Sequence, residues 1–280
     1  MDRNHGFTLL ELLIAIFIFG ILGTAITNMY IKNTRIHTAQ TQVVNTQMNL
    51  RAIADYLAME IRMAGFHNQM PPAEALASGT PVPGMTTATE SQFRFTMHDE
   101  AAGNLRDLDI RLRPADDANN DGIADTGNAN LCIQFSGAGG YQTIAEDIQA
   151  IAFAYGYDAN GNGAVDVYTT TTGTTEIIWA IPDPAGSGNW MRLDANGDGL
   201  INTDDDTDSD GTINLVNTGT AVDVDDIRAV RLTLLGTSDY PDQEFTNATA
   251  YCVGRHIIAP NDNIRRRILT AIIQCRNMGG

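Results

Sequence analysis

One stretch of the chain, residues 194–205, carries oxygen-bearing groups at the spacing of a calcium-binding loop. Ca²⁺ takes about six to eight oxygen ligands, and a glycine at loop position six permits the sharp turn between them. Gly199 holds that position, and an aspartate replaces the usual glutamate at position twelve. The ligand candidates at positions one, three, five, seven, nine and twelve are Asp194, Asn196, Asp198, Leu200 (through its carbonyl), Asn202 and Asp205. The spacing therefore predicts a Ca²⁺ site in this loop.

Three further stretches repeat this spacing less completely. The first follows at once, at 206–217, with the candidates Asp206, Asp208, Asp210, Thr212, Asn214 and, in the last position, Asn217. The second, within 117–128, offers Asp117, Asn119, Asp121 and Asp125, and the third, within 158–169, offers two carboxylates, Asp158 and Asp166. Asp, Asn and Gly are also common turn residues, so plain acidic turns are the alternative. The ten aspartates from Asp194 to Asp226 would repel one another without cations, which favours metal binding.

The composition argues against a nucleic-acid-binding protein and against an enzyme. The chain has 280 residues and a formal net charge of −17, from 34 acidic and 17 basic residues. Such a chain lacks the basic surface that binds nucleic acid, and its field attracts cations. The five histidines are scattered, and no nucleophile elbow, phosphate loop or dinucleotide-binding fingerprint occurs. We therefore expect a structural or binding protein without catalytic residues.

A long N-terminal helix is the first of the elements that must position these residues. An apolar run extends to Tyr30, and Glu11 is its only charged residue. About 20 apolar residues span a bilayer, and a charge within such a segment is costly and therefore functional by default. We expect a transmembrane helix at 7–30 and an amphipathic continuation at 31–64. The apolar face of that continuation contains Val43, Leu50, Ile53, Leu57 and Ile61.

Beyond the helix, at 65–280, the pattern changes to short strands and loops that would form a globular head. Alternating apolar and polar residues mark half-buried antiparallel strands, and short apolar runs mark buried ones. The expected strands are 92–97, 107–112, 148–157, 176–181, 227–235 and 264–275. One helix followed by strands predicts an α+β fold, in which the helix packs on an antiparallel sheet.

The three cysteines, Cys132, Cys252 and Cys275, are disulfide candidates. On the oxidising side of a membrane they could form one disulfide and leave one thiol, and the sequence permits three pairings. The alternative is that all three are buried apolar residues.

The N-terminal residues Gly6-Phe7-Thr8-Leu9-Leu10-Glu11 resemble those of type IV pilins and pseudopilins. In that family a prepilin peptidase cuts after the glycine and methylates the new N-terminus. The resemblance implies a leader at 1–6, a cut between Gly6 and Phe7, and an N-methylated Phe7 at the start of the mature chain. It also implies that Glu11 meets the N-terminal amine of a neighbouring subunit during assembly.

Three segments of the head, 152–158, 227–235 and 265–277, resemble PilW-like minor pilins, and 194–205 resembles a dockerin-type calcium loop. These resemblances imply a calcium-stabilised minor pilin that starts or tips a type IV pilus and assembles with other pilins through its helix. The alternatives are a minor pseudopilin of type II secretion and a calcium-dependent adhesin displayed on the pilus. The precursor is expected in the inner membrane, with a cytoplasmic N-terminus and a periplasmic head, and the mature chain in the extracellular pilus.

Overall fold

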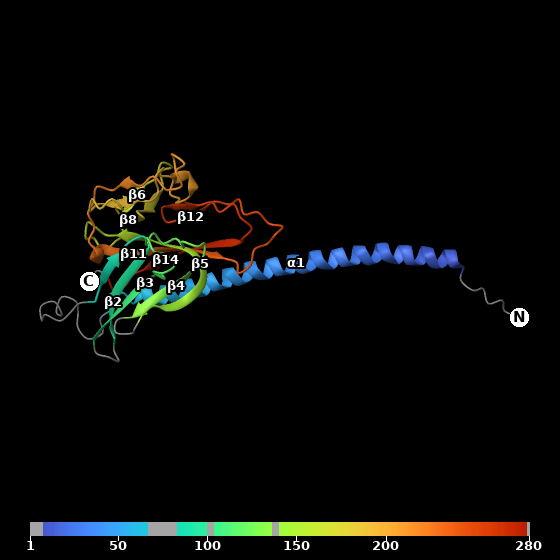
Figure 1. Cartoon of the computed structure of the whole chain (residues 1–280). Coiled ribbons are helices and arrows are strands. Elements are labelled where there is room, and N and C mark those ends of the chain that lie inside the picture. Colours follow the sequence, from blue (N-terminus) through green and yellow to red (C-terminus); the bar gives the residue numbers. More distant parts are fainter. Residues whose placement is uncertain (1–7, 67–82, 100–103, 136–139, 279–280) are drawn as a thin grey trace. The chain divides into compact units, whose positions relative to one another are not determined.

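The computed structural model describes residues 8–66, 83–99, 104–135 and 140–278 (Figure 1). The predicted leader, 1–6, and the residues of the predicted cut, Gly6 and Phe7, lie outside the described residues. The chain forms two compact units, Met1–Asn45 and Thr46–Gly280. We describe each unit by itself.

The helix α1 runs from Leu9 to Arg62, a length of 54 residues. All residues from 9 to 38 are exposed, including Leu9 at 76% and Phe19 at 80%. The helix is long and apolar enough to cross a membrane. Thr24 and Thr27 donate their hydroxyls to the carbonyls of Gly20 and Gly23, at 2.8 and 2.9 Å. These bonds satisfy polar groups within the helix, as a lipid environment requires.

In the second unit, α1 ends where the C-terminal residues of the chain meet it. The Asn277 side chain donates to the carbonyl of Arg62 at 3.0 Å, which satisfies one of the free carbonyls at the helix end. Gly65 follows in the left-handed region, with φ of 73°. A Cβ at Gly65 would lie 2.7 Å from the Met278 sulfur, so both the conformation and the space require glycine.

A large antiparallel sheet forms the centre of the second unit. Among the described residues it has ten strands, and β11 pairs with both β5 and β14. Its strands are β1 (Met85–Ala88), β2 (Gln92–Asp99), β3 (Asn104–Leu112), β4 (Ala129–Phe135), β5 (Gln142–Tyr157), β8 (Ala180–Pro182), β9 (Trp190–Arg192), β10 (Val216–Asn217), β11 (Ile227–Thr237) and β14 (Arg266–Gln274). Two small hairpins pair β6 (Val167–Thr169) with β7 (Thr175–Ile177), and β12 (Tyr251–Val253) with β13 (His256–Ile258). The predicted α+β fold is confirmed.

The predicted strand at 176–181 is the one that differs. It is divided between β7, which pairs with β6 in a separate hairpin, and β8, which joins the main sheet beside β5 and β9. Trp179, between the two, is buried in a small cluster with Ile181 and Leu193. The continuous apolar pattern gave no sign of this break, because both pieces are partly buried against different partners.

From Leu50 onward, the predicted apolar stripe of the helix packs on the sheet. Leu50, Leu57 and Ile61 are at most 1% exposed and share one core cluster with side chains of β2, β3, β5 and β11. A Cβ at Gly236 of β11 would lie 3.1 Å from a methyl carbon of Leu50, so helix and strand are in close contact. This stripe supplies the apolar cover for one face of the sheet.

Replacing a side chain of this stripe will weaken the fold. We expect Leu57→Ala to lower the free energy of unfolding by about 2–5 kcal/mol, because it leaves a cavity in a fully buried site. Met59→Ala is the matched control, since Met59 is two residues away and 57% exposed. Urea unfolding of the detergent-solubilised chain measures both, and equal losses from the two variants would contradict this packing.

The opposite face of the sheet supports the acidic loops. In β5, Ile151, Phe153 and Tyr155 belong to the helix-side core, whereas Ala152 and Ala154 belong to two smaller clusters. The small alanines leave room for a second layer that includes Val253 of β12 and Leu193 and Ile201 at the 194–205 loop. Figure 1 shows β6, β8 and β12 grouped on this side of β11.

Candidate functional site

The first and last aspartates of the 194–205 loop hold its backbone in place. Asp194 accepts N–H groups from Gly197 and Gly199 at 2.6 and 2.8 Å. Asp205 accepts from Ala195 at 2.7 Å, from Asn196 at 3.1 Å and from Asn202 at 3.0 Å. Both carboxylates are buried, at 4% and 0% exposed. Burial raises the pKa of Asp205, against the opposing effect of its backbone donors.

The four acidic loops share one hydrogen-bonded frame, in which the first aspartate accepts the N–H of the glycine at position six. These pairs are Asp117 with Gly122 (3.1 Å), Asp158 with Gly163 (2.8 Å), Asp194 with Gly199 (2.8 Å) and Asp206 with Gly211 (3.0 Å). Each of these glycines has φ between 82° and 93°. The oxygen at position five accepts the N–H of position seven in every loop: Asp121 from Ile123, Asn162 from Ala164, Asp198 from Leu200 and Asp210 from Thr212. The repeated spacing therefore produces a repeated structure.

The loops differ in the residue that closes them. Three are closed from position nine, where Asp125, Asp166 and Asn214 accept the N–H of position two at 3.0, 3.0 and 2.6 Å. In 194–205 that role belongs to Asp205, at position twelve. Position nine there is Asn202, which caps the short 3₁₀ helix Thr203–Asp205. The inward carboxylate of Asp205 fits its predicted place as the last residue of the loop, whereas the Asn202 side chain faces the 3₁₀ helix.

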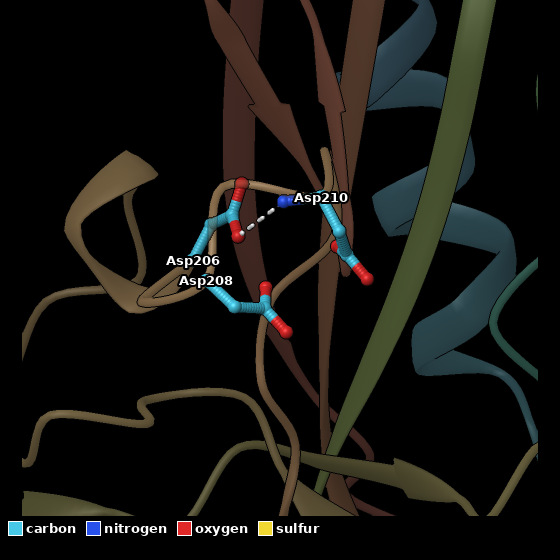
Figure 2. A group of neighbouring side chains, drawn as sticks. All are labelled: Asp206, Asp208 and Asp210. Atoms are coloured by element: carbon cyan, nitrogen blue, oxygen red, sulfur yellow. Dashed lines mark hydrogen bonds between the residues drawn. The ribbon is translucent and has the colours of Figure 1, made fainter.

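Among the described residues, a group of three neighbouring carboxylates belongs to the 206–217 loop. Asp206, Asp208 and Asp210 each offer a carboxylate oxygen within 4.8 Å of the others, and Figure 2 shows the three side chains grouped on the loop. Asp210 donates its N–H to Asp206 at 3.2 Å, while Asp208 has no hydrogen bond among the described residues. The calcium-loop spacing is most complete in 194–205, but this group of three close carboxylates lies in the next loop. Asp206 and Asp210 of that loop accept backbone N–H groups, as Asp194 and Asp205 do, whereas Asp208 accepts none among the described residues.

A tyrosine that the sequence analysis did not identify braces the 194–205 loop. The hydroxyl of Tyr168, in β6, donates to Asp194, and the guanidinium of Arg192 lies 4.2 Å from the centre of the Tyr168 ring. In the same hairpin Thr171 donates its N–H and its hydroxyl to the Gly197 carbonyl, at 2.7 and 3.1 Å. These contacts join two segments far apart in the chain, so no local sequence signal could have revealed them.

The three cysteines are free thiols. Cys132 is buried in β4, Cys252 is half-buried in β12, and Cys275 is buried after β14. Burial raises the pKa of Cys252 and of Cys275 to about 12. None of the pairings that the sequence permits is formed in the structure.

At the other end of the chain, Glu11 caps its own helix. One oxygen of its carboxylate accepts the N–H and the hydroxyl of Thr8, each at 2.9 Å, and the Glu11 N–H points back to the Thr8 hydroxyl at 3.3 Å. This is a capping box, and its sequence signal, a threonine followed three residues later by a glutamate, was present but not used. The other carboxylate oxygen has no hydrogen bond among the described residues, so capping leaves it available to a further donor.

The N-terminal segment that contains Glu11 is the part of the chain that a family model matches. Residues 1–27 match the family model for the prokaryotic N-terminal methylation motif. The chain carries the N-terminal motif of type IV pilin-like proteins. Type IV pilins are structural subunits that assemble with other pilins and are not enzymes. The motif and the exposed apolar helix that begins within it fit a membrane-anchored pilin precursor.

Comparisons of the whole chain give weaker matches than the N-terminal motif does. A type IV-like pilin from Thermus thermophilus is similar in structure, with a TM-score of 0.39 and 13% sequence identity. That match covers 84% of this chain and 98% of the other. A likeness at this level carries no argument about the head. No curated protein matches the chain.

Proposed function

We propose that this type IV pilin-like protein is a minor pilin, a structural subunit that initiates a type IV pilus or forms its tip. The observation that carries the proposal is the methylation motif at 1–27, within which a long helix with exposed apolar side chains begins. The head segments that resemble PilW-like minor pilins support the choice of a minor subunit. The Gly6–Phe7 bond is then the peptidase cut, and the inner membrane holds the precursor before assembly.

The exposed apolar helix needs an apolar environment both in the precursor and in the assembled filament. As a precursor it is stable in lipid, because about 20 apolar residues match the hydrocarbon core of a bilayer. In a filament its partners are the equivalent helices of other pilins. Glu11 serves both states: one oxygen caps the helix through Thr8, and the other can accept the N-terminal amine of a neighbouring subunit. The cost of a charge in an apolar environment makes that pairing selective.

We propose further that Ca²⁺ stabilises the head through the acidic loops. Support comes from the frame that all four loops share, which turns side-chain oxygens inward, and from the close group of Asp206, Asp208 and Asp210. Carboxylate, amide and carbonyl oxygens are the ligands that Ca²⁺ prefers. The formal net charge of −17 also attracts cations to the surface that carries these loops.

Fractionation of surface filaments tests the minor-pilin role. We expect the full chain to appear in filaments sheared from wild-type cells, in small amount relative to the main subunit. In cells without prepilin peptidase it should stay in the inner membrane. A chain that remains in the membrane while pili assemble normally would contradict the role. If its loss instead abolished protein secretion and left pili intact, the pseudopilin of type II secretion would replace the pilus subunit.

A further inference from the structure

A polar cavity of about 320 Å³ lies among β6, β9 and β10. Its lining includes Asp166, Arg192 and Asn217, together with Tyr157, Thr218 and Thr220, and we call it the Arg192 pocket. Ligand pockets typically have volumes of about 300–1,000 Å³ and carry a few convergent polar groups. Asp166 comes from the 158–166 loop and Asn217 from the end of the 206–217 loop, so separate parts of the chain converge here.

Arg192 is the unsatisfied group of this pocket. Its guanidinium forms no hydrogen bond and no ion pair within the described part of the chain, and its Nε is buried without a partner. The guanidinium lies over the Tyr168 ring, 4.2 Å from its centre, and it also interacts electrostatically with Asp205 without forming an ion pair. Guanidinium carries five N–H donors in a planar fork, which matches a carboxylate in bidentate geometry. A buried donor without a partner is costly, so this site favours an anionic acceptor.

The neighbouring groups define the rest of the ligand. Asn217 uses its oxygen to accept the N–H of Gly219 at 2.7 Å, and its amide N–H₂ has no hydrogen bond among the described residues. Asp166 accepts one donor on each oxygen, from Asn160 at 2.5 Å and Ala159 at 3.0 Å, and each oxygen keeps a further lone pair. The pocket thus offers free donors at Arg192 and Asn217 and an acceptor at Asp166. An anion without a hydroxyl group would leave the acceptor of Asp166 without a donor from the ligand.

We propose that the Arg192 pocket binds a hydroxylated carboxylate of the uronic acid class. The carboxylate of the sugar pairs with the Arg192 guanidinium and accepts from the Asn217 amide, and a ring hydroxyl donates to Asp166. The acceptor on Asp166 favours anions that also carry a hydroxyl donor. This binding site stands apart from the filament role, because none of its residues belongs to the N-terminal motif.

Binding of matched sugars to the full detergent-solubilised chain tests the proposal. Glucuronate and glucose share one ring and differ at C6, where one carries a carboxylate and the other a hydroxymethyl group. By titration calorimetry we expect glucuronate to bind at least tenfold more tightly than glucose, and also more tightly than acetate, which lacks the hydroxyls. Arg192→Gln should lower the affinity for glucuronate at least tenfold. Arg267→Gln, an exposed arginine on β14, should leave it unchanged.

The contradicting results are equally definite. No heat of binding with glucuronate, with or without Ca²⁺, would overturn the proposal. So would equal affinity for glucuronate, glucose and acetate, or unchanged affinity in Arg192→Gln. If circular dichroism shows that Arg192→Gln does not fold, Asn217→Ser provides the test, since serine keeps an oxygen for Gly219 but removes the free amide. Full glucuronate affinity in a folded Asn217→Ser would contradict the assigned carboxylate contact.

Discussion

Glu11→Gln will exclude the chain from filaments and leave its membrane helix intact. Glutamine keeps the capping box with Thr8, because Glu and Gln both serve at that position, but it removes the charge. Breaking one partner of a buried charge pair costs about 3–5 kcal/mol. At about 1.4 kcal/mol per factor of ten, incorporation should fall more than a hundredfold. The measurement is the amount of chain in sheared filaments relative to the membrane.

Two further variants separate charge from capping. Glu11→Ala removes both and should be excluded from filaments to the same extent, with insertion and cleavage retained. Asp55→Asn removes an exposed carboxylate from the same helix and should assemble normally. Normal recovery of Glu11→Gln in filaments, with Glu11→Ala excluded, would show that Glu11 acts only as a helix cap.

Calcium will raise the melting temperature of the head by several degrees. A ligand that binds only the folded state stabilises it by about 2.7 kcal/mol at a hundredfold excess over Kd. For a unit of this size, each kcal/mol moves Tm by roughly 2–4 °C, so we expect a rise of about 5–10 °C per site. Extracellular sites bind with Kd of roughly 0.1–1 mM, and the short aspartates should place these loops toward the weak end. Magnesium should substitute poorly.

Asp208 offers the sharpest variant for this test. Because it forms no hydrogen bond among the described residues, Asp208→Asn removes a proposed ligand charge without breaking the loop frame. It should reduce the calcium shift, whereas Asp204→Asn, an exposed acid of the preceding loop, should leave it intact. A calorimetric scan of the full chain compares them in Ca²⁺ and in chelator. If Ca²⁺ moves Tm no more than NaCl of equal ionic strength, the loops are acidic turns only.

Periodicity predicted the long helix and the longest strands, because each of them buries one regular face, but it did not predict β1, β4, β9 and β10. The apolar run before Tyr30 and the stripe through Leu50, Leu57 and Ile61 predicted one long helix with two different environments. Alternation located β2 and β3, and a longer apolar run located β5. The break between β7 and β8 was missed, because pairing partners distant in the chain decide where a short apolar run divides.

The candidate site was predictable in its spacing and not in its side-chain directions. Aspartates and glycines at fixed intervals were enough to locate four loops, because each frame forms from hydrogen bonds within one loop. Whether a carboxylate faces a backbone donor or its neighbours depends on the closing residue and on contacts such as that of Tyr168 with Asp194. The unsatisfied guanidinium of Arg192 likewise arises from tertiary structure.

The mass of the N-terminal peptide, measured on chain purified from membranes or filaments, tests the central claim most directly. Because the methylation motif covers residues 1–27, we expect the mature chain to begin at Phe7, with one methyl group on its amine. In cells whose prepilin peptidase is inactive, the N-terminal peptide should keep residues 1–6 and carry no methyl group on Phe7. A mature N-terminus elsewhere in the chain, or an intact Gly6–Phe7 bond in cells with active peptidase, would contradict assembly as a pilin.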